Sequence, residues 1–166
     1  MKHPHGNKAT LCKWLRMFGV ITLLISGSGG TWADAVGFNP GINDLGVRVT
    51  FNVDIVGDFA ELAGGVIDLG FDSDVVQINS VTINPFFDFL PNGGGPAAGD
   101  SWPGISFDFF ANKPAKGNFT IATVNLTTLV GGAFDLTVLE TSEFFSLTAQ
   151  LSPTRNLGTI TVRAPP

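Results

Sequence analysis

The chain has 166 residues, a formal net charge of −5 and an apolar fraction of 44%. Nine Lys and Arg oppose 14 Asp and Glu, so the chain lacks the clustered positive charge with which nucleic-acid-binding proteins neutralise phosphates. Nucleic acid and anionic membrane surfaces are therefore poor candidate partners.

The first 35 residues have the order of a secretory leader. Four Lys and Arg residues precede an apolar run from Met17 to Ile25, and small residues follow it up to Ala33-Asp34-Ala35. The apolar run is about half the roughly 20 residues that a membrane-spanning helix needs. We therefore expect cleavage after Ala35, which gives a signal peptide at 1–35 and one domain at 36–166. The alternative is a short uncleaved N-terminal anchor.

Removal of this leader would change the chemistry available to the protein. His3, His5 and Cys12 are the only histidines and cysteine of the chain, so residues 36–166 contain neither type. Ser-His-Asp and Cys-His catalysis would then lack their base, and a zinc site would lack its usual ligands. We expect a protein that is not an enzyme, with paired carboxylates of the glycoside hydrolase kind as the distant alternative. The remaining five Lys and Arg and 13 Asp and Glu give a net charge of −8.

Alternating apolar and polar residues predict β-strands throughout the rest of the chain. The alternation is complete over residues 47–55, where Val49, Phe51 and Val53 alternate with polar side chains. The other predicted strands cover residues 67–72, 77–83, 105–110, 119–126, 133–139, 144–151 and 158–163. Glycine and proline turn signals separate them, and no long window has the period of a helix. The pattern predicts an all-β, antiparallel β-sandwich with one shared core.

Residues 84–104 form the longest segment without a strand pattern, because proline and glycine interrupt it repeatedly. Loops of this length are often functional. The segment contains Phe86, Phe87 and Phe89, which we consider candidate ligand-binding residues. Two interpretations remain open, since these rings either close the end of the sandwich as a lid or form an exposed anchor.

Calcium is the one metal for which the sequence offers ligands, and we expect no other cofactor. Asp72 and Asp74 follow a predicted strand that also contains Asp68, and Ca²⁺ binds carboxylate and carbonyl oxygens. The segment lacks the spacing of an EF-hand loop, and Asp-Ser-Asp is also an ordinary turn composition. A calcium site and a structural turn are both open at this point.

Trp102 is the single tryptophan after the leader, and the chain contains no tyrosine. Carbohydrate-binding sandwiches stack sugars on exposed aromatic rings, so Trp102 together with the loop phenylalanines is the candidate for a glycan site. A platform of several Trp or Tyr rings cannot be built from residues 36–166.

Three segments, taken in chain order, resemble the sequence pattern of a known family. Residues 47–53 read VRVTFNV, residues 63–76 read AGGVIDLGFDSDVV, and residues 157–162 read LGTITV. In this order they resemble the cohesin-like domains of secreted bacterial proteins. The resemblance implies a jelly-roll-like sandwich of about nine strands, shared with some carbohydrate-binding modules, and a protein partner of the dockerin type bound across one sheet face.

The resemblance also bears on location. Similar domains occur in surface proteins of Gram-negative bacteria that end in a sorting signal, and this chain ends at 163–166, where such a tail would begin. We expect a secreted or periplasmic protein, with association with the cell surface left open. Its expected function is non-catalytic binding of an extracellular protein, either of the dockerin type or in matrix adhesion. The alternative is a carbohydrate-binding module with a polysaccharide partner.

Overall fold

The computed structural model describes residues 33–39, 43–95, 99–109 and 114–163, all within one compact unit. No helix occurs in these ranges, so none of them contains a helix able to cross a membrane. The strands are β1 Ala35–Phe38, β2 Asn43–Leu45, β3 Thr50–Leu62, β4 Gly64–Gly70, β5 Val76–Ile83, β6 Asn92–Gly93, β7 Ser101–Asp108, β8 Ala115–Thr128, β9 Gly132–Val138, β10 Glu143–Phe145, β11 Gln150–Leu151, β12 Thr154–Arg155 and β13 Gly158–Val162.

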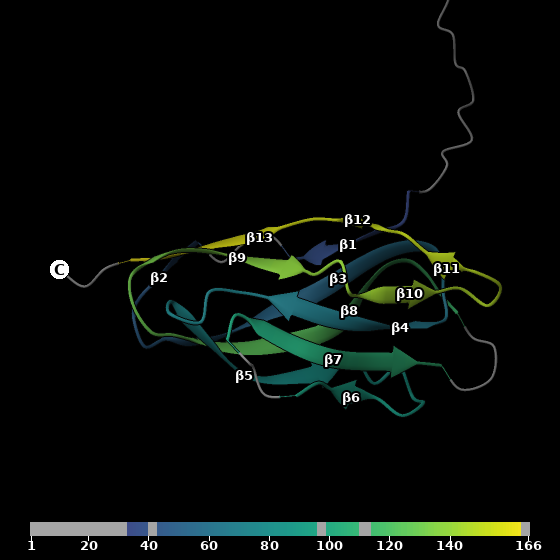
Figure 1. The fold of residues 1–166 in the computed structure, drawn as a ribbon, viewed down its shortest axis with the longest axis horizontal. Helices are drawn as coiled ribbons and strands as arrows, with labels where there is room; N and C mark the ends of the chain where they lie inside the picture. The colour runs from purple at the N-terminus through teal and green to yellow at the C-terminus, as the bar shows by residue number, and fades with distance from the viewer. Residues whose placement is uncertain (1–32, 40–42, 96–98, 110–113, 164–166) are drawn as a thin grey trace, which may run out of the picture. The chain divides into compact units, whose positions relative to one another are not determined.

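The strands form two sheets (Figure 1). One has the order β12-β1-β3-β8-β5, and the other has the order β11-β10-β4-β9-β13-β2, with β7 paired to β4 and β6 paired to β7. Most pairs are antiparallel, while β1–β12 and β13–β2 are parallel. The expected all-β sandwich is therefore confirmed.

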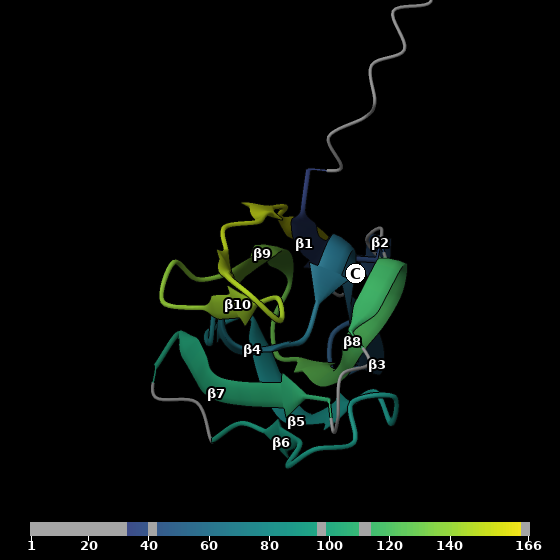
Figure 2. The same ribbon diagram turned by 90° about the vertical axis from the view of Figure 1, so that its right-hand side faces the viewer.

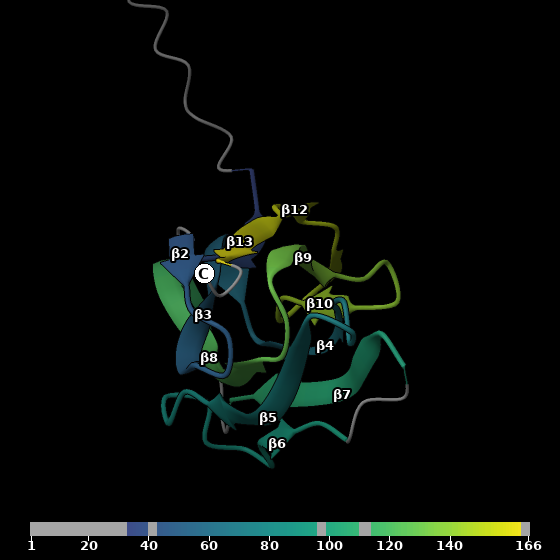
Figure 3. The same ribbon diagram turned by 90° about the vertical axis from the view of Figure 1, so that its left-hand side faces the viewer.

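The two sheets face each other (Figures 2 and 3), and the side chains between them form one apolar core. In β3, Phe51, Val53 and Ile55 are buried while the residues between them are more exposed, as the alternation predicted. Ile67 of β4 and Leu126 of β8 are fully buried from opposite sheets. Burial of these side chains, at about 25 cal/mol per Å² of apolar surface, is what drives the sheets together.

The connection between β3 and β4 is shorter than the sequence suggested. The predicted strands at 47–55 and 67–72 leave a loop between them that ends in the turn signal Gly64-Gly65, but β3 continues to Leu62 and both glycines lie in β4. The chain passes from one sheet to the other at Ala63, whose N–H donates to the carbonyl of Phe145 at 2.7 Å. A glycine pair is common in turns, but here both glycines permit close packing of neighbouring strands.

The predicted single strand at 144–151 was also wrong. It is a hairpin of β10 and β11, in which Phe144 pairs with Leu151 and Phe145 pairs with Gln150. Ser146 closes the turn, because its N–H donates to the carbonyl of Ala149 at 2.8 Å. The apolar content of residues 144–151 indicated one continuous strand. Ser146 ends that strand, because it forms hydrogen bonds within the turn.

Candidate functional site

A groove of about 520 Å³ lies on the face of the sheet that contains β10, β4 and β7. We call it the β4 groove. Its lining consists of Ala63, Gly64, Gly65, Val66, Phe89, Leu90, Ser106, Phe107, Asp108, Phe145, Ser146 and Leu147. The residues come from three strands, from the segment that follows β5 and from the β10–β11 hairpin, so the groove exists only in the folded chain.

Strand register explains the low floor of the groove. Gly64 of β4 pairs with Phe145 on one side and with Asp108 on the other. A Cβ atom at Gly64 would lie 2.8 Å from the carbonyl oxygen of Phe107, which is closer than Cβ atoms come to other atoms. Glycine is therefore required at position 64. Because glycine has no side chain, the sheet surface is low at this point, and larger side chains stand on both sides of it.

Large apolar side chains form both walls. Phe89 and Leu90 stand on the β5–β6 side with exposed fractions of 39% and 76%, and Phe145 and Leu147 stand on the hairpin side with 38% and 51%. Scattered exposed apolar residues are normal in proteins, but a contiguous group indicates a binding surface. Among the described residues, four of the nine large apolar side chains that are exposed to solvent line this groove.

Leu90 has an unusual backbone. Its φ is 46°, in the left-handed region, which a bulky residue adopts at a cost on the order of 1–3 kcal/mol. The strained residue is also the most exposed of the four wall residues. In the free domain, the strained backbone of Leu90 is not offset by packing of its side chain, because that side chain lies in solvent. This favours a role for Leu90 in contact with another molecule.

The opposite wall is fixed by hydrogen bonds. Glu61 of β3 accepts a bond from the N–H of Leu147 at 3.2 Å, and the hydroxyl of Ser146 accepts bonds from the N–H groups of Thr148 and Ala149. These bonds hold the hairpin turn in one geometry. Phe145 and Leu147 are therefore presented by an ordered wall and not by a loose loop.

Three acidic residues lie at or beside the β4 groove. Asp108 lines it, Glu143 lies beside Val66 in the strand register, and Glu61 holds its hairpin wall. The lining contains no Lys or Arg. Because the walls have low polarity, a cation brought to this rim would be less screened than in open water.

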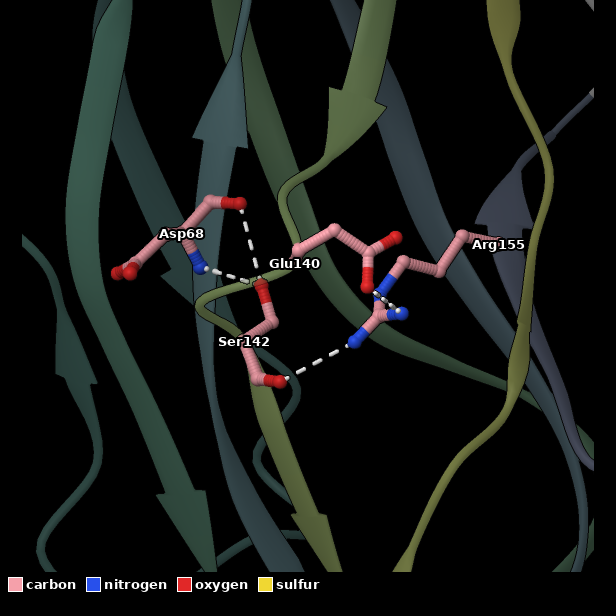
Figure 4. A network of polar contacts seen from close by, with 4 residues as sticks. All are labelled: Asp68, Glu140, Ser142 and Arg155. Atoms are coloured by element: carbon pink, nitrogen blue, oxygen red, sulfur yellow. Dashed lines mark hydrogen bonds and ion pairs between the residues drawn. The ribbon is translucent and has the colours of Figure 1, made fainter.

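A network of polar contacts connects β4 of one sheet with β12 of the other through the segment between β9 and β10 (Figure 4). Arg155 of β12 forms an ion pair with Glu140 at 2.8 Å and donates to the carbonyl of Ser142 at 3.3 Å. The Ser142 hydroxyl accepts a bond from the N–H of Asp68, and the Asp68 carboxylate accepts bonds from the Gly104 N–H at 2.8 Å and the Thr141 hydroxyl at 2.6 Å. Both carboxylate oxygens of Asp68 have donors, so this network supports the fold.

The predicted calcium residues lie in the turn after β4. An oxygen of the Asp72 carboxylate accepts a bond from the N–H of Asp74 at 3.0 Å, and the Asp72 carbonyl accepts bonds from Val75 and Val76. Within the described part of the chain, no three Asp, Glu, His or Cys residues are grouped closely enough to hold a metal. Calcium at Asp72 and Asp74 stays a prediction.

Asp100, which precedes β7 and contacts this turn, has a perturbed pKa. Both the hydroxyl and the N–H of Ser73 donate to Asp100, at 2.6 and 3.1 Å, and these bonds lower the pKa of the Asp100 carboxyl below its ordinary value. We expect Ser73→Ala to raise the pKa of Asp100 toward that of a free aspartate, measurable by NMR titration. A lowered pKa stabilises the folded state at neutral pH, and the contribution disappears as the pH falls through the lowered pKa. An unchanged pKa in Ser73→Ala would show that the hydroxyl bond is absent in solution.

Trp102 lies away from the β4 groove, in a pocket of about 400 Å³ between β7 and β5. Its indole N–H donates to the carbonyl of Gly93 at 2.8 Å, and its ring packs on the core, so the ring has a fixed orientation. Ser73 and Gln77 provide polar groups in this pocket. Phe71, Val76, Ile78 and Leu129 complete its lining.

The three predicted loop phenylalanines have different positions. Phe87 is 1% exposed and contacts Phe107 and Phe109 in the core, which is the arrangement of a lid. Phe86 is 55% exposed, and Phe89 stands in the wall of the β4 groove. The structure therefore does not gather Phe86, Phe87, Phe89 and Trp102 in one site.

Sequence reasoning missed Leu90, Phe145 and Leu147. A weak signal existed for Phe145, because two consecutive phenylalanines in one strand must place one ring on the outer face. No sequence signal identified Leu90 or Leu147, since their role depends on which segments the fold places opposite each other.

No protein-family model and no protein with curated annotation matches the sequence. Solved structures do match the fold. The seventh type I cohesin of the Pseudobacteroides cellulosolvens protein ScaB aligns with a TM-score of 0.67 and 13% identity, over 81% of this chain and 94% of that chain. The sixth cohesin of Acetivibrio cellulolyticus scaffoldin B, solved in complex with a Cel5 dockerin, aligns with a TM-score of 0.67 and 8% identity, over 79% and 99%.

A non-cellulosomal cohesin from the archaeon Archaeoglobus fulgidus aligns similarly, with a TM-score of 0.64 and 11% identity over 80% of this chain and 92% of that chain. The alignments span nearly the whole of each cohesin, although few residues are identical. The match therefore concerns the arrangement of strands. The described part of this chain is a domain with the cohesin fold.

Proposed function

We propose that this protein is an exported, non-catalytic domain that binds another protein in the β4 groove. The proposal depends on one observation: the two walls of the groove consist of exposed apolar side chains. These are Phe89 and Leu90 on one side, and Phe145 and Leu147 on the other. The fold adds support, because a cohesin with the same fold was solved in complex with a dockerin. An extracellular partner of the dockerin or the matrix-adhesion type fits this role.

The groove restricts the chemistry of the partner. Its apolar walls suit a segment with two or three exposed aliphatic or aromatic side chains, and the acidic rim formed by Glu61, Asp108 and Glu143 suits Lys or Arg beside that segment. We therefore expect binding that weakens as salt concentration rises, since exposed charge pairs are screened.

The groove is poorly suited to hydrolysis. A glycoside hydrolase needs two carboxyl groups facing each other across the substrate, and Asp108 is the one acid in the groove lining. One of its oxygens already accepts a bond from the N–H of Phe109 at 2.7 Å. The geometry supports binding better than catalysis.

Introducing a negative charge into each wall of the β4 groove tests the proposal. We expect Leu90→Asp and Leu147→Asp each to weaken binding of the partner at least about tenfold, because a buried carboxylate without a counter-ion is costly. Leu157→Asp is the matched control, since Leu157 is 64% exposed and does not line the groove. The partner is first recovered from culture medium by affinity capture, and its affinity for each variant is then measured by calorimetry.

If Leu90→Asp and Leu147→Asp both bound the partner as tightly as the wild-type protein and Leu157→Asp do, the β4 groove would be rejected as the binding site. Loss of binding in Leu157→Asp alone would place the interface elsewhere. Thermal unfolding of each variant shows whether a change in affinity reflects a change in folding.

A second candidate function is carbohydrate binding at Trp102. The fixed ring beside Ser73 and Gln77 combines an aromatic surface with groups that hydrogen-bond to hydroxyls. Binding on a glycan array that is lost in Gln77→Ala and in Trp102→Ala, and retained in Leu147→Asp, would favour this function over protein binding. Gln77 is exposed, so its replacement leaves the core unchanged.

A further inference from the structure

Two residues of the expected leader belong to the folded domain. The carbonyl oxygen of Asp34 accepts a bond from the N–H of Thr154 at 2.8 Å, and an oxygen of its carboxylate accepts a bond from the N–H of Ala60 at 3.0 Å. Ala35 is the first residue of β1 and pairs with both Asp58 of β3 and Thr154 of β12. Asp34 and Ala35 thus join three strands of one sheet.

Cleavage after Ala35 would remove all of these contacts. It would leave β1 to begin at Val36 and would leave the N–H groups of Ala60 and Thr154 without these partners. β12 has two residues, and both pair only with Ala35 and Val36 in the described sheet, so it would lose half of its pairing. The mature domain is more complete when Asp34 is retained.

The sequence offers a second cleavage site that keeps both residues. Signal peptidases require small residues at the first and third positions before the cut. Ala33-Asp34-Ala35 meets this requirement, and so does Thr31-Trp32-Ala33, which ends two residues earlier. Ala33 is exposed and precedes the first strand, so a cut after it interrupts no pairing of the sheet.

We propose that the leader is removed between Ala33 and Asp34, so that the mature chain consists of residues 34–166. One water molecule hydrolyses this peptide bond, which leaves a carboxylate on Ala33 and an amino group on Asp34. The Ala35–Val36 bond lies inside β1, where both residues pair with β3 and β12, so a cut there removes part of the sheet. The Ala33–Asp34 bond precedes β1, so a cut there leaves every pair of the strand in place.

The mass of the exported protein tests this inference. The full chain with its leader is expressed in a Gram-negative bacterium, and the processed product is purified from outside the cytoplasm for intact-mass measurement and N-terminal sequencing. We expect a product that begins with Asp34. A product that begins with Val36, which is lighter by one Asp and one Ala residue, would overturn the inference, and so would a chain that keeps its leader.

Two variants separate the sites. Thr31→Phe removes the small third residue of the proposed site and leaves the later site intact, so we expect uncut precursor or a product beginning with Val36. Ala35→Val removes the small residue before the later cut and keeps a strand-forming side chain, so we expect the Asp34 terminus unchanged. Processing that is lost in Ala35→Val and normal in Thr31→Phe would refute the proposal. None of these readouts depends on what the β4 groove binds.

Discussion

Replacing Phe87 with alanine should lower the free energy of unfolding by about 3–5 kcal/mol. The ring is 1% exposed and contacts those of Phe107, Phe109 and Phe119 at centroid distances of 4.9, 4.7 and 6.1 Å. Its removal would leave a cavity at the end of the sandwich that the rigid sheets cannot fill. Urea denaturation followed by fluorescence or circular dichroism measures the change.

Phe86→Ala is the matched control, one position earlier in the same segment. Phe86 is 55% exposed and touches Phe109 edge-on at 4.8 Å, so we expect a loss of about 1 kcal/mol from the ring pair. Equal destabilisation by the two variants would contradict the lid arrangement, because it would mean that both rings are equally buried in solution.

The second large effect is expected at Gly65, in the sheet beneath the β4 groove. A Cβ atom there would lie 2.6 Å from the carbonyl oxygen of Glu143 and 3.0 Å from the ring of Phe107. The first of these atoms belongs to the backbone, so β10 must move away from β4 to admit it. We expect Gly65→Ala to destabilise the domain by about 1–3 kcal/mol. It should also weaken partner binding, because Phe145 moves with β10.

Gly95→Ala provides the comparison. A Cβ atom at Gly95 would meet no atom within 4 Å, so its unfolding free energy should stay within about 0.5 kcal/mol of the wild type. If Gly65→Ala were as stable as Gly95→Ala, the close approach of β10 to β4 would be refuted. If Gly65→Ala were destabilised without any change in affinity, the hairpin wall would not take part in binding.

Much of the fold followed from the sequence because strand periodicity is a local property. The alternation of Phe51, Val53 and Ile55 identified the central strand and its buried face. The limits of the strands were less accurate. β3 begins at Thr50, after Arg48 in a left-handed conformation, and it continues past the alternating region to Leu62. β1 was missed because only its first residue, Ala35, lies in the expected leader and the other three are too few to show an alternation; the strand is stabilised by distant pairing with β3 and β12.

The candidate site was mostly beyond sequence reasoning. Phe89 was named as a ligand-binding candidate and lies in the groove wall, but Phe87 from the same segment is in the core and Trp102 faces another pocket. Side chains two positions apart in a loop, such as those of Phe87 and Phe89, have no fixed relation to each other. Which of them remains exposed depends on the core that receives the others.

The sequence alone determined the class of fold and the absence of histidine and cysteine after residue 12, because composition and side-chain alternation are properties of the chain itself. Only the tertiary structure decided that Leu90, Phe145 and Leu147 form one groove and that Asp34 belongs to the domain. The physical reason is that these relations arise from pairing between strands far apart in sequence. Such pairing is selected by the packing of the whole core and leaves little trace in any short segment.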